Sequence, residues 1–158
     1  MTTNHKIRDR AGAVAWRRAQ NGPVVFTNGV FDLMHPGHVG LLERARSEGM
    51  ALVVGVNSDS SVRSLGKGPG RPLVAEADRA RVLAALEAVG CVVLFAEPTP
   101  LELITALEPD VLVKGADYTR EQIVGADLVE RRGGRVVRVK LVAGYSTTLL
   151  VERLRASS

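Results

Sequence analysis

The sequence predicts a three-layer α/β fold, a five-stranded parallel sheet with helices on both faces. Short apolar segments of strand length alternate with amphipathic segments of helix length about five times along the 158 residues. The glycines, hydroxyls and charged residues gather directly after the predicted strands, where the ligands of parallel sheets bind. Parallel pairing with right-handed crossovers follows from this alternation. The expected class is therefore Rossmann-like.

Length and composition favour one small-molecule-binding domain over residues 1–158, in which residues 1–22 form a leading helix and turn. Lys and Arg number 21 against 17 Asp and Glu, and the net charge of +4 suits an anionic substrate. Six aromatic residues and the lack of a long basic run disfavour nucleic-acid binding.

The compartment is expected to be the cytoplasm. Cys91 is the only cysteine, so no intramolecular disulfide forms, and its apolar surroundings predict a buried structural thiol. The first ten residues are polar, which argues against a signal peptide. No apolar run approaches the ~20 residues of a membrane span, so we expect no membrane partner.

The first half of the chain predicts two strands and three helices. A leading helix over residues 8–20 ends before Asn21-Gly22-Pro23. A buried strand follows at 23–26, and a helix at 37–47 begins beside Pro36, which suits a first helical turn. Residues 51–57 are almost uninterruptedly apolar, as a parallel strand buried on both faces should be. The third helix is expected at 76–88, with Val82, Leu83 and Leu86 inward and Arg79 and Arg81 available at its sides.

Residues 58–72 are rich in Gly, Pro and Ser and predict a mobile loop. Loops longer than about 12 residues in compact domains are often functional lids. Lys67 and Arg71 lie among its glycines, which suits closure over phosphates. An ordinary solvated linker is the alternative interpretation.

The second half repeats the alternation. We expect strands at 91–95, 110–113 and 135–139, and helices at 100–107, 122–131 and 147–155.

Two of the three histidines lie together where the first strand gives way to a helix. His35 and His38 share one face of the first turn, where free N–H groups and the helix dipole favour an anion. Local capping or packing would be the plain explanation for a single histidine. Two at one strand-turn-helix junction favour a phosphate site.

Two later segments could complete that site. Lys114 leaves an apolar strand before Gly115, from where an ammonium can reach a phosphate, although a strand-end lysine is often only solvated. Ser146, Thr147 and Thr148 open the last helix, and capping requires only one hydroxyl. Three in a row suit a second anion site that faces the histidines.

These motifs resemble those of a known family. Residues 27–32 running into His35-Pro36-Gly37-His38, together with Gly144-Tyr145-Ser146-Thr147-Thr148, resemble the two signatures of the cytidylyltransferase-like nucleotidyltransferases. The resemblance extends from about Val24 to Leu154. Within the family, residues 54–59, 71–72, 109–118 and 133–134 are most similar to the subgroup that adenylylates D-glycero-β-D-manno-heptose 1-phosphate with ATP.

The resemblance implies a role for each motif residue. His35, His38 and Lys67 would be catalytic. The nucleotide would contact Asn28, Gly29, Phe31, His35, His38, Lys114, Gly115, Asp117, Tyr118, Ser146, Thr147 and Thr148. Arg71 and Arg79 would bind the sugar phosphate; Asp32 would bind its hydroxyls or orient a loop, and we favour the hydroxyls.

The resemblance also implies partners. Mg²⁺ would arrive with ATP, held by phosphate oxygens and water, without a dedicated protein metal cage. We expect a homodimer that takes its sugar phosphate from a separate sugar kinase, because 158 residues are too few to include one. Two alternatives are a CTP-dependent enzyme acting on an alcohol phosphate such as glycerol 3-phosphate, and a non-catalytic nucleotide-binding module. Glu87 lies where glycerol-phosphate enzymes tend to carry a basic residue, which counts against the first.

Overall fold

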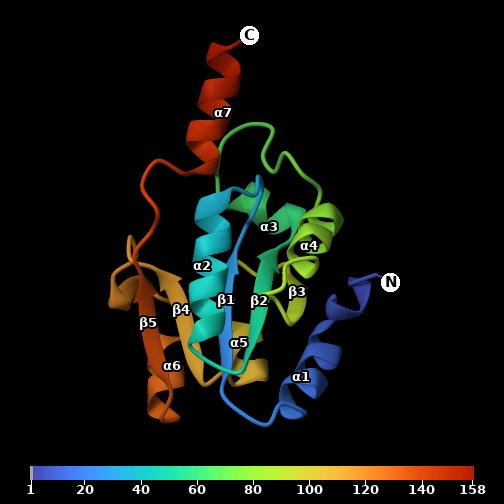
Figure 1. The fold of residues 1–158 in the computed structure, drawn as a ribbon, viewed down its shortest axis with the longest axis vertical. Coiled ribbons are helices and arrows are strands. Elements are labelled where there is room, and N and C mark those ends of the chain that lie inside the picture. The colour runs from blue at the N-terminus through green and yellow to red at the C-terminus, as the bar shows by residue number, and fades with distance from the viewer. Residues whose placement is uncertain (1) are drawn as a thin grey trace.

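The computed structural model describes residues 2–158 and contains one five-stranded parallel sheet (Figure 1). The strands are β1 (Val24–Gly29), β2 (Ala51–Asn57), β3 (Cys91–Phe95), β4 (Val111–Gly115) and β5 (Arg135–Val139). Their order in the sheet is β3-β2-β1-β4-β5, and every pairing is parallel. The chain therefore builds outward from β1 in one direction and then in the other. The switch point lies between β1 and β4, where such folds bind ligands.

Helices cover both faces of the sheet, as predicted. One face packs against α1 (Arg10–Arg18), α5 (Leu101–Leu107) and α6 (Ala126–Arg131), and the other against α2 (Pro36–Ser47) and α4 (Glu76–Ala84). Successive residues of β1 serve opposite cores: Val24 and Phe26 face the first, and Val25 faces the second. This two-sided burial explains why the strands are almost wholly apolar. Cys91 is fully buried in the first core, as expected.

Three details differ from the sequence-based expectations. Residues 58–72 are not all loop, because α3 (Asp59–Ser64) begins there with the Ser58 side chain capping the N–H of Ser61. The predicted helix 122–131 is divided into η2 (Arg120–Gln122) and α6, with Gly125 at φ +85° between them. In α4, which ends at Ala84 rather than 88, Val82 is not inward but 45% exposed.

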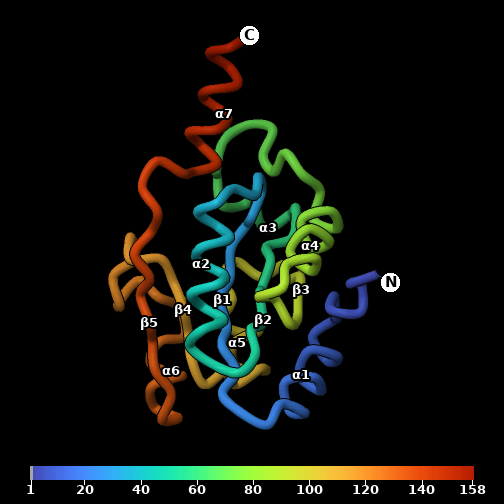
Figure 2. Tube along the Cα trace, viewed as in Figure 1, coloured from blue at the N-terminus to red at the C-terminus, as the bar shows by residue number. Residues whose placement is uncertain are grey.

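Two segments rise above the carboxyl edge of the sheet. The loop between α3 and α4 arches over this edge, and the chain after β5 crosses to the same side before entering α7 (Thr147–Ala156) (Figure 2). Helix α7 projects beyond the other layers and has no buried residue (Figure 1). A short helix, η1 (Asn4–Lys6), precedes α1 at the other end of the chain. None of the helices within residues 2–158 has the length and apolar character needed to cross a membrane.

Candidate active site

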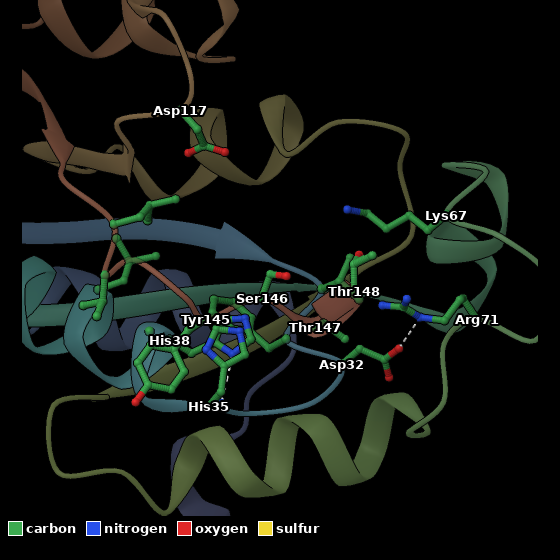
Figure 3. A pocket seen from close by; sticks show the side chains of 16 residues that line it. Asp32, His35, His38, Lys67, Arg71, Asp117, Tyr145, Ser146, Thr147 and Thr148 are labelled. Carbon is green, nitrogen blue, oxygen red and sulfur yellow. Dashed lines mark hydrogen bonds and ion pairs between the residues drawn. The ribbon is translucent and has the colours of Figure 1, made fainter. Parts of the chain in front are cut away.

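Two adjoining hollows open at the carboxyl edge of the sheet. The first, the histidine hollow, has a volume of about 460 Å³ (Figure 3). Its lining is Val30, Phe31, Asp32, His35, Gly37, His38, Leu41, Lys67, Arg71, Asp117, Leu141, Val142, Tyr145, Ser146, Thr147 and Thr148. The second hollow has about 420 Å³ and is lined by Asn28, Gly29, Val30, Asn57, Leu65, Lys67, Pro98, Thr99, Pro100, Lys114, Tyr118, Gln122 and Val124. Val30 and Lys67 border both.

Two segments that are far apart in the sequence form the walls of the histidine hollow. Residues 30–38 form one, which we call the histidine wall, and residues 145–148 form the other, the hydroxyl wall. Both motifs were predicted to lie at the carboxyl edge of the sheet, and in the structure both line the same hollow. Lys67 reaches toward this space from the loop above (Figure 3).

The histidine wall begins with a strained turn. Phe31 has φ +51°, a left-handed conformation that costs a non-glycine residue about 1–3 kcal/mol. It is nonetheless buried, and its ring packs against Gly29 and meets the His38 ring edge-on at 5.4 Å between centroids. The turn therefore fixes one side of the His38 imidazole.

The two imidazoles stack on each other, with centroids 3.8 Å apart and planes 24° apart. Burial, together with the neighbouring His35, lowers the pKa of His38 to about 4, and burial also lowers the pKa of His35. The backbone N–H of His35 lies 3.3 Å from Nδ1 of His38 and donates to it. In the neutral ring this acceptor role leaves the proton on Nε2, so His38 has an N–H to donate.

The hydroxyl wall divides its three hydroxyls among different tasks. Ser146 is the N-cap of α7 and accepts the N–H of Leu149 at 3.0 Å. Thr147 lies 3.5 Å from the carbonyl of Leu33, a contact between the two walls. Thr148 is exposed and lines the hollow. One hydroxyl therefore does serve as a cap, and Thr148 remains the clearest ligand candidate.

Asp32 is engaged by the protein rather than open to a sugar. It is only 4% exposed, and its carboxylate accepts the N–H groups of Leu73 and Val74, both at 2.9 Å, and Nε of Arg71 at 2.7 Å. Burial would raise its pKa, but these three donors prevail and lower it. This geometry favours the loop-orienting role over the preferred contact with sugar hydroxyls. Arg71 still lines the hollow beside it.

Arg79 is not available at the side of its helix, contrary to expectation. It is 1% exposed, and its guanidinium donates to the carbonyls of Val74, Val30 and Asn57 at 2.9, 2.7 and 2.8 Å. Its remaining nitrogen pairs with Asp59 at 2.8 Å. A guanidinium so occupied is not free to meet an acceptor phosphate. No pattern in the sequence indicates its burial.

Lys114 borders the second hollow and not the first. It lies within β4, which extends to Gly115 rather than ending at 113, and its ammonium donates to the carbonyl of Asn28 at 3.0 Å. The ring of Tyr118 lies 4.8 Å away. Burial lowers the Lys114 pKa to about 8, although Asp117 opposes this; Lys67 lowers it further.

The predicted nucleotide-binding residues are thus divided between the hollows. Asn28, Gly29, Lys114 and Tyr118 line the second, Asp117 lines the first, and Gly115 lines neither. A Cβ on Gly115 would lie 2.5 Å from the Asp117 carboxylate, so this glycine leaves room for that side chain.

Two parts of the lining were not predicted from the sequence. Pro98, Thr99 and Pro100 follow β3 and line the second hollow. Their signal was present, because they too follow a predicted strand. An apolar end of the histidine hollow, formed by Leu41, Leu141, Val142 and Tyr145, was also missed, and no local motif marks it.

Comparison with known proteins agrees with this geometry. The profile of the cytidylyltransferase-like family matches residues 26–153. The chain belongs to this family. The match confirms the prediction made from the two motifs, and with it the class of enzyme, a nucleotidyltransferase.

Curated relatives are close in sequence but much longer. The bifunctional protein HldE of Magnetococcus marinus is 61% identical over 143 residues, which are 90% of this cytidylyltransferase-like chain and 29% of the relative. HldE of Mesorhizobium japonicum is 60% identical over 162 aligned residues, covering 99% of this chain and 32% of the relative. The chain spans less than a third of the length of either protein.

Solved structures share the fold. A lipopolysaccharide core biosynthesis protein from Thermoplasma volcanium aligns with a TM-score of 0.67 and 26% identity, over 77% of this chain and 99% of the other. The pantoate-beta-alanine ligase of Francisella tularensis, at 14% identity, aligns with a TM-score of 0.60 over 94% of this chain and 76% of its own. The second likeness concerns the fold alone.

Proposed function

We propose that this chain transfers AMP from ATP to D-glycero-β-D-manno-heptose 1-phosphate, giving ADP-heptose and pyrophosphate. The observation that carries the proposal is the histidine hollow, which the paired imidazoles, the hydroxyl wall and Lys67 line together. One hollow thereby combines N–H, hydroxyl and ammonium donors, the set that a triphosphate requires.

The nucleotide would occupy the histidine hollow as a whole. Its phosphates would lie between His38 and Thr148, and its base would rest against the apolar end near Tyr145, whose ring is 6.0 Å from that of His35. Nδ1 of His35 is buried without a hydrogen-bond partner in residues 2–158, and a phosphate oxygen would satisfy it.

The acceptor would enter through the second hollow. Lys114, which the resemblance assigns to the nucleotide, lines this second hollow and is proposed here to hold the acceptor phosphate instead. Because Lys67 and Val30 border both hollows, that phosphate would lie beside the triphosphate. Its oxygen would attack the α-phosphorus as the bond to the bridging oxygen breaks and pyrophosphate leaves. No group on the protein forms a covalent intermediate in this reaction, so positioning and charge stabilisation carry the catalysis.

The histidines would act as hydrogen-bond donors rather than as bases. His38, neutral near pH 7 and protonated on Nε2, would donate to an oxygen on which charge develops. Phosphate binding nearby would raise the pKa of either ring toward its ordinary value.

Mg²⁺ fits this hollow as an ion carried by the nucleotide. In the described part of the chain no group of three His, Cys, Asp or Glu side chains could hold a metal ion. Asp32 is paired with Arg71, so Asp117 is the carboxylate lining the hollow that would hold a water of such an ion. When bound, the ion supplies positive charge to the transferring phosphates.

The choice of ATP and heptose rests on similarity. Residues 54–59 and 109–118 resemble the heptose subgroup, and the Thermoplasma volcanium protein of similar fold is a lipopolysaccharide core biosynthesis protein. A kinase must supply the sugar 1-phosphate. Homodimerisation and placement in the cytoplasm remain predictions.

Pyrophosphate release tests the function. The purified chain is assayed with ATP or CTP against heptose 1-phosphate or glycerol 3-phosphate, each with Mg²⁺. We expect rapid release only with ATP and heptose 1-phosphate. Release with CTP and glycerol phosphate would establish the alternative enzyme, and tight nucleotide binding without release from any pair would establish a binding module.

A further inference from the structure

The strained turn at Phe31 is held on both sides by one segment of the chain, residues 73–79. On one side, the Val30 carbonyl accepts from Nη1 of Arg79 at 2.7 Å. On the other, the Asp32 carboxylate accepts the backbone N–H groups of Leu73 and Val74. Both residues that flank Phe31 are therefore held by the same segment of the chain, Val30 by the Arg79 side chain and Asp32 by backbone N–H groups.

These contacts close into a ring. Val74 donates its N–H to Asp32 and accepts Nε of Arg79 at its carbonyl, so the ring runs from Arg79 through Val30, Phe31, Asp32 and Val74 back to Arg79. Arg79 also joins this ring to the carboxyl end of β2 through Asn57 and to α3 through Asp59. The two charged residues in this set of contacts are buried, since Arg79 is 1% and Asp32 4% exposed.

This closed set of hydrogen bonds acts on His38 and His35 through Phe31. A residue at φ +51° keeps that conformation only where its surroundings impose it. The Phe31 ring in turn packs edge-on against His38, whose ring stacks on His35. Loosening the ring of contacts would let the turn relax and move both imidazoles.

We propose that Arg79 is a positioning residue that imposes the strained Phe31 turn and so places His38 and His35, without touching either substrate. The expected effect of Arg79 on kcat rests on the proposed function, whereas its effect on the placement of the two imidazoles does not. The two are therefore measured separately.

The first readout is catalytic. Arg79→Ala is expected to lower kcat about 10²-fold, the scale of a misplacement of about 1 Å at a reacting centre. Guanidinium ion at millimolar concentration should restore at least tenfold of this loss by refilling the vacated site, and methylammonium at equal ionic strength should not. Full activity in a folded Arg79→Ala protein, or equal restoration by methylammonium, would overturn the proposal.

Arg17→Ala is the matched control. Arg17 also donates to backbone carbonyls, those of Leu107 and Glu108, and pairs with Asp110, but at the opposite edge of the sheet. It should lose stability with kcat unchanged. A loss of kcat equal to that of Arg79→Ala would reduce the effect to general destabilisation and contradict the proposal.

The second readout is the NMR spectrum of the histidine rings, which requires no activity. In Arg79→Ala the His38 ring signals should shift as the Phe31 ring departs, and the His38 titration midpoint should rise from about 4. Arg17→Ala should leave both unchanged. If Arg79→Ala does not fold, Arg79→Lys, which offers one ammonium for four acceptors, must show the same shifts in weaker form.

The arms separate the two claims. Unchanged His38 signals in folded Arg79 variants would overturn the positioning role and leave the proposed function standing. If the His38 signals shift in the Arg79 variants but the unsubstituted chain releases no pyrophosphate, the positioning role stands and the proposed function is rejected.

Discussion

The histidine wall and the hydroxyl wall face the same hollow, but they are anchored to the fold in different ways. Phe31 and Asp32 of the histidine wall are buried, and the Asp32 carboxylate accepts hydrogen bonds from the backbone N–H groups of Leu73 and Val74. The hydroxyl wall precedes and begins α7, a helix with no buried residue. It meets the other wall through the Tyr145 ring beside His35 and through one long hydrogen bond, from Thr147 to the Leu33 carbonyl at 3.5 Å.

This difference assigns different work to the two walls. Groups held rigidly before substrate arrives are suited to stabilise a transition state, because no ordering cost falls on the reaction. Groups on a weakly packed segment must be ordered by the substrate, so their hydrogen bonds contribute mainly to binding. Changes in the histidine wall should therefore lower kcat, and changes in the hydroxyl wall should raise KM.

The largest expected effect is that of His38→Ala. Removing one preorganised donor should lower kcat by about 10²-fold to 10³-fold with little change in the KM for ATP. Steady-state pyrophosphate release measures the loss, and circular dichroism should show an intact fold. His5→Ala, at an exposed histidine in η1, is the control. Undiminished turnover would sink the catalytic assignment and with it the contrast between the walls.

Gly37→Ala sharpens the comparison without removing a functional group. An added Cβ would lie 2.9 Å from Cε1 and Nδ1 of His35 and 3.1 Å from the Tyr145 Cβ, so the His35 ring must move. We expect kcat to fall about 10-fold to 10²-fold, with thermal stability almost unchanged.

Gly40→Ala is the paired control for this change. It lies in the same helix, and its added Cβ would approach Val142 only to 3.7 Å, an ordinary contact. It should retain normal kinetics. Equal losses in both alanine variants would show that the effect belongs to the helix and not to the His35 ring.

Thr148→Val tests the hydroxyl wall. Losing one hydrogen bond to a charged phosphate should raise the KM for ATP about tenfold, with kcat changed by less than about threefold. Thr105→Val, at an exposed threonine of α5, should have neither effect. A fall in kcat as large as that of His38→Ala would mean that the two walls act alike.

The smallest expected effect is a pH dependence outside both walls. Lys114 is charged below its pKa of about 8 and neutral above it, so its hold on an acceptor phosphate weakens as pH rises through 8. The kcat/KM for the acceptor should be about fourfold lower at pH 8.5 than at low pH. Lys114→Gln should abolish this dependence, and a profile unchanged by that substitution would contradict the role of Lys114.

The strand-end motifs could be predicted from the sequence because chemistry and topology coincide there. The alternation of strands and helices predicts a parallel sheet, whose strands all have their carboxyl ends at one edge. Residues that follow these strands, such as His35, Lys67 and Thr148, are therefore expected to lie close together. The same rule also applies to residues 98–100, which follow β3 and line the second hollow.

The contacts of Asp32 and Arg79 could not be predicted in this way. The family resemblance implies the sugar hydroxyls or a loop as the partner of Asp32, and the acceptor phosphate as the partner of Arg79. Besides Arg71 and Asp59, their partners are backbone groups of residues 30, 57, 73 and 74, and a residue of any type carries such groups. No sequence pattern reports which carbonyl a guanidinium will find. Likewise, Lys114 within β4 and Asp117 in the turn after it line different hollows, although they are only three residues apart in the sequence.

The burial of Cys91 makes the chain a convenient host for a reactive label. Its side chain is fully enclosed, and burial raises the pKa of the thiol to about 11, so at neutral pH almost no thiolate is present to react. A single cysteine introduced on the exposed loop, as in Pro69→Cys, would accept a maleimide fluorophore almost alone. The fluorescence of that label during a nucleotide titration would report changes around the loop that carries Lys67, and Cys91 would not have to be replaced beforehand.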